Sequence, residues 1–186
     1  MAPFLALTGF MGSGKTSVGA AVAAFLGWRF VDLDEAFVEA GTGGIPDFFA
    51  TEGEAAFRAR ECEILEMVLT QDPDVSGLVV ALGGGTLESS EAVAMLRQRG
   101  GVVFLDVDPG EAWARVEGTP RPLARDNESF RALLARRREA YENAADWVLP
   151  VETKSVDQLA EEIVQMVRLA GSHWQTLWGR RLRATE

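Results

Sequence analysis

Short apolar runs alternate along this chain with longer stretches in which apolar side chains recur every three or four residues. Such runs predict parallel strands that are buried on both faces, and the stretches between them predict helices. The pattern therefore indicates an α/β fold in three layers, with a five-stranded parallel sheet flanked by helices. The expected strands are Phe4–Thr8, 29–33, 78–82, 102–106 and 147–151.

The helical stretches begin and end at residues that commonly bound helices. The first, Lys15–Leu26, stops before Gly27, and a proline opens Pro109–Val116. In the first helix, the apolar side chains expected to face the sheet are Val18, Val22, Phe25 and Leu26. The other expected helices are 35–40, 46–50, 54–69, 88–99, 129–144 and 156–169.

The composition predicts one soluble domain over residues 1–170, followed by a tail over 171–186. The chain has 186 residues, of which 47% are hydrophobic and 25% charged, and its net charge is −10. This acidic balance argues against a nucleic-acid partner and favours a small-molecule substrate. The single cysteine, Cys62, cannot form an internal disulfide and is expected to fill space in the core. We expect no signal peptide and no membrane span, and hence a cytoplasmic protein.

Residues 9–16 fit the pattern G-x-x-x-x-G-K-[ST] and lie between the first strand and the first helix. This pattern predicts a phosphate-binding loop, or P-loop. Gly12 and Gly14 allow the backbone N–H groups to surround phosphate oxygens at the positive end of the helix. Lys15 is expected to reach the β- and γ-phosphates, and the Thr16 hydroxyl to ligate Mg²⁺. The alternative is a glycine-rich turn with a surface lysine.

Acidic residues follow two of the predicted strands. Asp32 and Asp34 are two residues apart, so in an extended chain both carboxylates lie on one side of the strand, at the edge where ligands bind in such sheets. The alternative is that Asp34 only caps the helix 35–40 and Asp32 is an ordinary acid at a strand end. Asp106, at the end of 102–106, competes with Asp32 for the Mg²⁺ role.

Two further features suggest an anion site. Glu54, Arg58 and Glu61 fall on one helix face, which indicates either a guanidinium held ready for a bidentate anion or a surface ladder of ion pairs. The three glycines 83–85 end the strand 78–82. They indicate either a close approach of the backbone to another group or a loose connection to the next helix.

The last third of the chain is rich in arginine. Residues 117–129 contain Gly118, Arg121 and Arg125, a composition typical of a lid that closes over phosphates, although a plain surface loop is the alternative. The helix 129–144 carries four arginines, and their spacing does not single one out. They are Arg131, Arg136, Arg137 and Arg138.

Taken together, these motifs resemble the shikimate kinase family, small relatives of the nucleoside monophosphate kinases. The motifs occur in the same order as in that family, and the resemblance extends from about Leu5 to Ile163. The motifs are Gly9-Phe10-Met11-Gly12-Ser13-Gly14-Lys15-Thr16, Asp32-Leu33-Asp34, Gly53-Glu54 with Phe57-Arg58, Leu82-Gly83-Gly84-Gly85, Arg121-Pro122-Leu123 and Arg137-Arg138-Glu139-Ala140-Tyr141.

The resemblance implies a kinase that transfers a phosphoryl group from ATP to the 3-hydroxyl of shikimate, with Mg²⁺. The segment 34–62 would bind the substrate, through Asp34, Arg58, Gly84 and Arg137. The implied catalytic residues are Asp34, Lys15 and Arg121, and the implied metal-binding residues are Thr16 and Asp32. The implied nucleotide-binding residues are Gly12, Ser13, Gly14, Lys15, Thr16, Ser17, Arg115 and Arg121. The implied apolar walls around the substrate ring are Ile45, Phe49, Phe57 and Leu123.

The chain departs from the family pattern at Gly44, where a serine is common, at Ala124, where a leucine is common, and in a shorter interval from Arg115 to Arg121. The family is commonly monomeric, so a monomer is expected. One rival function is another small-molecule kinase of the same fold, acting on gluconate or a nucleoside monophosphate. Another is a nucleotide-dependent switch, although no Asn-Lys-x-Asp sequence that would read guanine is present.

Overall fold

The computed structural model describes residues 3–70, 76–117 and 126–170. Its centre is a five-stranded sheet in the order β2-β3-β1-β4-β5, and every neighbouring pair is parallel. This confirms the predicted fold class. The strands are β1 (Phe4–Thr8), β2 (Arg29–Asp32), β3 (Leu78–Ala81), β4 (Gly101–Asp106) and β5 (Trp147–Pro150).

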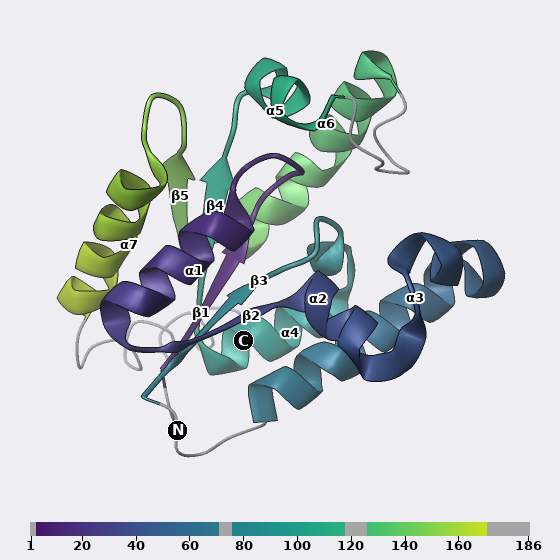
Figure 1. Ribbon diagram of the computed structural model, residues 1–186, viewed down its shortest axis with the longest axis horizontal. Helices are drawn as coiled ribbons and strands as arrows, with labels where there is room; N and C mark the ends of the chain where they lie inside the picture. Colours follow the sequence, from purple (N-terminus) through teal and green to yellow (C-terminus); the bar gives the residue numbers. More distant parts are fainter. Residues whose placement is uncertain (1–2, 71–75, 118–125, 171–186) are drawn as a thin grey trace.

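Helices cover both faces of the sheet (Figure 1). α1 and α7 lie side by side against one face, and α4 and α6 lie against the other. The helical elements are α1 (Lys15–Leu26), α2 (Leu33–Phe37), η1 (Val38–Thr42), α3 (Ile45–Thr70), η2 (Thr86–Glu88), α4 (Ser90–Arg99), α5 (Pro109–Val116), α6 (Asn127–Ala144) and α7 (Val156–Ala170). None of the helices within these described ranges is long and apolar enough to cross a membrane.

The central strand β1 is buried along its whole length, as its apolar run predicts. It pairs with β3 on one side, through Leu7 and Ala81, and with β4 on the other, through Leu7 and Val103. Because all strands are parallel, their carboxyl ends lie at one edge of the sheet. The P-loop, Asp32, the triple glycine and Asp106 are therefore brought to the same edge.

The expectation that Phe25 faces the sheet is wrong, because its side chain is 49% exposed. The buried stripe of α1 passes through Val18, Gly19, Val22 and Ala23. At 100° per residue, this stripe is centred about a quarter of a turn away from Phe25. Gly19 permits the close approach, since a Cβ at this position would overlap the ring of Phe30.

The segment that carries Arg58 projects from the sheet as the long helix α3 (Figure 1). Two helices are predicted here, over 46–50 and 54–69. The structure has a helix on each side of Gly53, whose φ of 81° is not helical, so the prediction of two helices is confirmed; α3 (Ile45–Thr70) comprises both. Cys62 is buried on this helix and contacts the Ser89 hydroxyl at 3.2 Å, as expected for a residue that fills space.

Candidate active site

The P-loop joins β1 to α1 and packs against α5. Gly14 precedes the helix in a left-handed conformation, with φ of 91°. Gly12 also has a positive φ, 79°, and a Cβ there would lie 2.8 Å from the Ala112 carbonyl oxygen of α5. A side chain is thus excluded by both conformation and space. The loop can approach α5 only because this position is glycine.

Side chains of the P-loop lie close to its backbone. Lys15 donates from Nζ to the carbonyl oxygens of Gly9, at 2.8 Å, and Phe10, at 3.1 Å. The Ser13 hydroxyl is buried and has no hydrogen-bond partner within the described residues. Arg115 donates to the Gly12 carbonyl oxygen at 2.9 Å and forms an ion pair with Glu111 at 3.0 Å. These contacts place Arg115 beside the loop. The side chain of Ser17, implied by the resemblance, lies on the exposed side of α1.

Asp32 connects the P-loop helix to α2. Its Oδ2 accepts a hydrogen bond from the Thr16 hydroxyl at 2.7 Å, and its Oδ1 accepts one from the Asp34 amide at 3.0 Å. Asp32 is therefore the N-cap of α2, and the alternative that Asp34 is the cap is wrong. The expectation that both carboxylates share one side of a strand is also wrong. β2 ends at Asp32, and Asp34 lies in the first turn of the helix α2. In a helix, side chains two positions apart point to different faces.

Arg58 is held between two carboxylates of its own helix, as its spacing predicts. Its guanidinium lies 2.8 Å from Glu61 and 3.8 Å from Glu54. Glu61 is only 2% exposed and also accepts a hydrogen bond from the Thr86 hydroxyl at 2.7 Å. A buried carboxylate with two partners does not belong to a surface ladder. The structure therefore favours the other alternative, in which Arg58 is held in place.

Arg137 differs from the other arginines of α6 in its burial. Its side chain is 4% exposed, compared with 65% for Arg136 and 40% for Arg138. It follows Phe130 and Leu134 and precedes Tyr141 on the buried stripe of the helix. Its position at helical spacing among apolar residues is a signal in the sequence that could have distinguished it from the other arginines.

The triple glycine is the place where these elements meet. A Cβ at Gly85 would lie 2.7 Å from the Arg58 Cζ and 2.8 Å from the Arg137 Nη2. A Cβ at Gly83 would lie 2.9 Å from the Asp34 carboxylate. These distances confirm the prediction of a close approach and exclude a loose connection. Asp34, Arg58 and Arg137 are thus gathered around one glycine-rich strand end.

Tyr141 anchors the middle of this loop from α6. Its hydroxyl donates a hydrogen bond to the Gly84 carbonyl oxygen at 2.5 Å. Burial is the main cause that raises the pKa of the Tyr141 phenol, so the hydroxyl stays protonated and able to donate. Tyr141 therefore holds the triple glycine in position beside Arg137.

Glu88 is a member of this cluster that no motif in the sequence marks. It ends η2, and its Oε2 accepts hydrogen bonds from Arg137 Nε at 3.2 Å, from Arg137 Nη2 at 3.0 Å and from Arg58 Nη2 at 3.4 Å. Its Oε1 accepts one from Arg136 at 3.2 Å. An acid at the start of a predicted helix is common, so its local surroundings gave no sign of this role.

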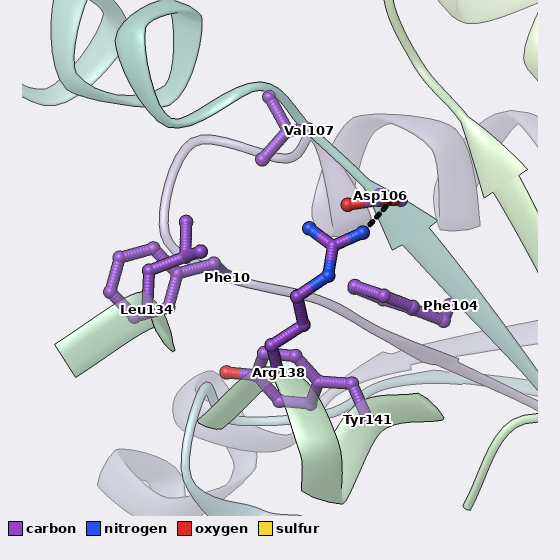
Figure 2. Close-up of a pocket in the computed structure, with 7 residues that line it drawn as sticks. All are labelled: Phe10, Phe104, Asp106, Val107, Leu134, Arg138 and Tyr141. Atoms are coloured by element: carbon purple, nitrogen blue, oxygen red, sulfur yellow. Dashed lines mark hydrogen bonds and ion pairs between the residues drawn. The ribbon is translucent and has the colours of Figure 1, made fainter. Parts of the chain in front are cut away.

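A small pocket lies behind the P-loop, between β4 and α6 (Figure 2). Its lining residues are Phe10, Phe104, Asp106, Val107, Leu134, Arg138 and Tyr141. Arg138 crosses it to bind Asp106 at 2.5 Å, and this hydrogen bond raises the pKa of the Arg138 guanidinium. Asp106 is thus paired with an arginine, whereas Asp32 contacts Thr16. Between the two acids considered for the Mg²⁺ role, the geometry favours Asp32.

Aromatic rings fill the angle between α2 and α3. Phe49 and Phe57 are 4.4 Å apart between ring centroids, and Phe37 lies 4.8 Å from Phe57. The Arg58 guanidinium lies 5.1 Å from the centroid of the Phe57 ring. Ile45 packs against the hydrophobic core at the start of α3. Arg121 and Leu123, which the resemblance also implies, lie outside the described residues.

These elements bring a loop suited to phosphate oxygens and two arginines suited to an organic anion to the ends of adjacent strands, β1 and β3. An arrangement of this kind can align a nucleotide with a second, acidic molecule for transfer of a phosphoryl group. The fold and the site therefore define a small-molecule kinase of the P-loop class.

Comparison with known proteins gives the family. The model of the family described as shikimate kinase matches residues 11–168. The chain therefore belongs to the shikimate kinase family and is a small-molecule kinase with ATP as its co-substrate.

Individual relatives agree with this assignment. A shikimate kinase of Chlorobium phaeobacteroides is 36% identical over 174 residues, which cover 87% of this chain and 88% of the relative. A shikimate kinase of Geobacter metallireducens is 40% identical over 160 residues, which cover 84% of this chain and 87% of the relative. Among solved structures, a shikimate kinase from Acinetobacter baumannii in complex with shikimate has a TM-score of 0.84 and 31% identity, covering 92% of this chain and 96% of that chain.

Proposed function

We propose that the protein transfers the γ-phosphoryl group of ATP to the 3-hydroxyl of shikimate and releases shikimate 3-phosphate and ADP. The observation that carries this proposal is the convergence of Arg58 and Arg137 on a single carboxylate beside Gly85. Shikimate has one carboxylate, and guanidinium groups are the side chains best suited to bind it. The shikimate complex of the Acinetobacter baumannii relative supports the same substrate.

ATP would bind with its phosphates in the P-loop, where the backbone of residues Gly12, Ser13 and Gly14 and the side chain of Lys15 offer donors. The buried Ser13 hydroxyl, which has no partner within the described residues, is consistent with a site that a ligand completes. Ser17 would lie at the start of α1 near the same phosphates. Arg115, beside Gly12, would lie over the adenine.

Thr16 and Asp32 fit an Mg²⁺ site. Their oxygens lie 2.7 Å apart at the mouth of the P-loop, and hard oxygen ligands are the ones that Mg²⁺ prefers. Thr16 would hold the ion directly, and Asp32 would hold it through the water shell. When bound there, Mg²⁺ supplies positive charge that offsets the charge of the β- and γ-phosphates.

The acceptor would be held by its acid group and oriented by its hydroxyl groups. Arg58 and Arg137 would grip the carboxylate, and the backbone at Gly84 would contact the ring. Asp34 would accept hydrogen bonds from the ring hydroxyls, and it would orient the 3-hydroxyl and accept its proton. The apolar walls around the ring would be formed by Ile45, Phe49, Phe57 and Leu123.

Arg121 would complete the site from the lid, residues 117–129. A guanidinium placed on the transferring phosphoryl group stabilises the charge that develops in the transition state. Together with Lys15, Arg121 would act in the chemical step. Closing the lid would also exclude water and so limit hydrolysis of ATP.

We also propose that residues 1–170 form one kinase domain, with 34–62 as the substrate-binding segment and 171–186 as a tail. The protein would act as a monomer in the cytoplasm, without a nucleic-acid or membrane partner. The net charge of −10 supports the expectation that nucleic acid is not a partner, because the phosphate backbone would repel an acidic protein.

The test is an assay of ADP release with ATP, Mg²⁺ and a panel of acceptors: shikimate, gluconate and nucleoside monophosphates. We expect release to depend on shikimate, with the phosphate on the 3-hydroxyl when the product is examined by NMR. Preference for gluconate or for a nucleotide would identify another kinase of this fold. Binding of ATP with no transfer to any acceptor would overturn the proposal.

A further inference from the structure

The carboxylate of Glu88 lies between the two arginines that are proposed to bind the substrate. Its Oε2 contacts Arg137 Nη2 at 3.0 Å and Arg58 Nη2 at 3.4 Å. Arg58 comes from α3 and Arg137 from α6, and Glu88 from η2 lies between them. Glu88 therefore presents to the two guanidinium groups the same chemical group that an organic acid would present.

We propose that Glu88 is an internal competitor for the carboxylate of the substrate, so that it sets the affinity of the site for shikimate. This inference rests on the proposed function. If the substrate binds through Arg58 Nη2 and Arg137 Nη2, its carboxylate takes the position of the Glu88 Oε2. Two carboxylates cannot share that position, because like charges a few ångströms apart in a partly buried site repel each other strongly.

Neither of the neighbouring acids, Glu61 and Glu54, is placed to compete with the substrate carboxylate for both arginines. Glu61 is 2% exposed and is held by Arg58 Nη1 at 2.8 Å and by the Thr86 hydroxyl at 2.7 Å. Glu54 is 65% exposed and lies 3.8 Å from Arg58 Nη2, farther than the 3.4 Å of Glu88 from the same nitrogen. Glu88 is thus the acid of this cluster that touches both arginines.

Arg136 can remain the partner of the Glu88 carboxylate when that carboxylate leaves Arg58 and Arg137. Its side chain is 65% exposed and binds the Glu88 Oε1 at 3.2 Å, on the side of the carboxylate that faces solvent. When the substrate takes the inner position, Glu88 can remain paired with Arg136 at the surface. The exchange then replaces one carboxylate on Arg58 and Arg137 by another, and leaves no guanidinium of this cluster without a carboxylate.

The opposite role for Glu88 makes the opposite prediction. If its carboxylate served to hold Arg58 and Arg137 in position for the substrate, its removal would loosen both arginines and weaken binding. If it competes, its removal strengthens binding. The direction of the change therefore distinguishes the two roles.

The experiment is a comparison of Glu88→Gln with the wild-type protein. The substitution keeps the size of the side chain and removes its charge. We expect the KM for shikimate to fall about tenfold, equivalent to about 1.4 kcal/mol, while kcat and the KM for ATP change much less. Calorimetric titration with shikimate should show the same fall in Kd, and Glu88→Ala should change Kd in the same direction.

Arg136→Gln tests the second half of the exchange. Without its outer partner, Glu88 should leave Arg58 and Arg137 less readily, so the KM for shikimate should rise. This rise should disappear in the double variant with Glu88→Gln, because no carboxylate is left to move.

The matched control is Glu63→Gln, which removes a carboxylate from an exposed ion pair with Arg60 on α3. Its KM for shikimate should equal that of the wild type. A KM that is unchanged or higher in Glu88→Gln, with an active wild type, overturns this inference alone. A wild-type protein that releases no ADP with shikimate overturns the proposed function itself.

Discussion

Burial separates Arg137 from the other arginines of its helix. A charge that is 4% exposed is tolerated only when it is paired, and Glu88 provides two hydrogen bonds to it. Arg58 is paired with Glu61 through Nη1 at 2.8 Å and with Glu88 through Nη2 at 3.4 Å. Both guanidinium groups thus have carboxylate partners in the folded protein.

Replacement of either arginine by lysine should impair the proposed acceptor site. An ammonium group keeps the charge but cannot make two parallel hydrogen bonds to one carboxylate. For Arg58→Lys and Arg137→Lys we expect kcat/KM for shikimate to fall by about tenfold at least, and on the order of a hundredfold where two charge-assisted bonds are lost. The measurement is steady-state kinetics at varied shikimate.

The control for this pair is Arg60→Lys, on the same helix as Arg58 and paired with Glu63 at the surface. It should keep the wild-type kcat/KM. Full turnover by Arg58→Lys or Arg137→Lys would count against the arginine pair as the carboxylate site.

Tyr141 can be followed directly, because it is the one tyrosine of the chain. Burial raises the pKa of its phenol above the ordinary value near 10. The folded protein therefore should not form tyrosinate in the pH range where a free tyrosine ionises. The folded state holds this proton more tightly than the unfolded state, so the stability that the neutral phenol contributes is complete below about pH 10 and is lost as the pH rises through the folded pKa.

Ultraviolet absorbance of tyrosinate during an alkaline titration measures the ionisation of Tyr141. In the folded protein the absorbance should rise together with unfolding, and in denaturant it should rise near pH 10. A folded protein that titrates near this ordinary value would show that Tyr141 is not buried against Gly84.

At the level of elements, the loop after β3 is where α3, η2 and α6 come together. Gly83 is close to Asp34 and Glu61, Gly85 is close to Arg58 and Arg137, and the Gly84 carbonyl is bound by Tyr141. The absence of three side chains lets polar groups from separate helices reach one strand end. The loop contributes to the site mainly because it has no side chains where the polar groups of α2, α3 and α6 lie.

Gly85→Ala should therefore damage the site more than the fold. The added Cβ would meet only the guanidinium ends of Arg58 and Arg137, which can shift while the backbone of the loop and of both helices stays in place. We expect the KM for shikimate to rise by more than about tenfold, because Arg58 and Arg137 no longer converge, while the melting temperature changes by only a few degrees. Kinetics and thermal unfolding measure the two effects.

Gly110→Ala is the control, since a Cβ there would meet the Asp108 carboxylate at 3.0 Å and the Arg131 guanidinium at 3.7 Å, away from Arg58 and Arg137. It should leave the KM for shikimate unchanged. An equal KM for Gly85→Ala and the wild type would contradict the close packing of this loop.

At the scale of the whole molecule, the strand order β2-β3-β1-β4-β5 sets which strand ends are neighbours. β1 and β3 are adjacent, although Thr8 and Leu78 are far apart along the chain. The P-loop after β1 and the triple glycine after β3 therefore lie side by side. In open sheets of this type the crevice at the carboxyl ends of the strands is the usual binding place for ligands.

Binding at such a site should stabilise the whole fold. A ligand at about one hundred times its Kd adds about 2.7 kcal/mol, which for a protein of this size corresponds to a rise in melting temperature of roughly 5–10 °C. Shikimate at this concentration should produce such a shift in the wild type. At the same concentration the shift should be much smaller in Arg137→Lys, and no shift in the wild type would contradict the proposed substrate.

The predicted strands and most helices agree with the structure to within one or two residues, with a larger difference at 35–40, where α2 ends at Phe37. The errors arose where packing changed a local pattern. Phe25 fits the helical period, but the residues that α1 buries are Val18, Gly19, Val22 and Ala23, whose stripe is centred about a quarter of a turn away from it. The spacing of Asp32 and Asp34 fits an extended strand, but the Asp32 carboxylate accepts a hydrogen bond from the Asp34 amide and caps a helix there. Arg137 was chosen among the four arginines through the family resemblance, although its helical spacing from Phe130, Leu134 and Tyr141 also marks it as part of the buried stripe of α6.

The five strands, the helices between them and the phosphate-binding loop follow from the amino-acid order, because each depends on residues within a few positions along the chain. The cluster of Arg58, Glu88 and Arg137 depends on contacts between residues 30 and 49 positions apart. Such contacts exist only after β3, α3 and α6 have packed together. No local pattern encodes them, which is why Glu88 became visible only in the folded molecule.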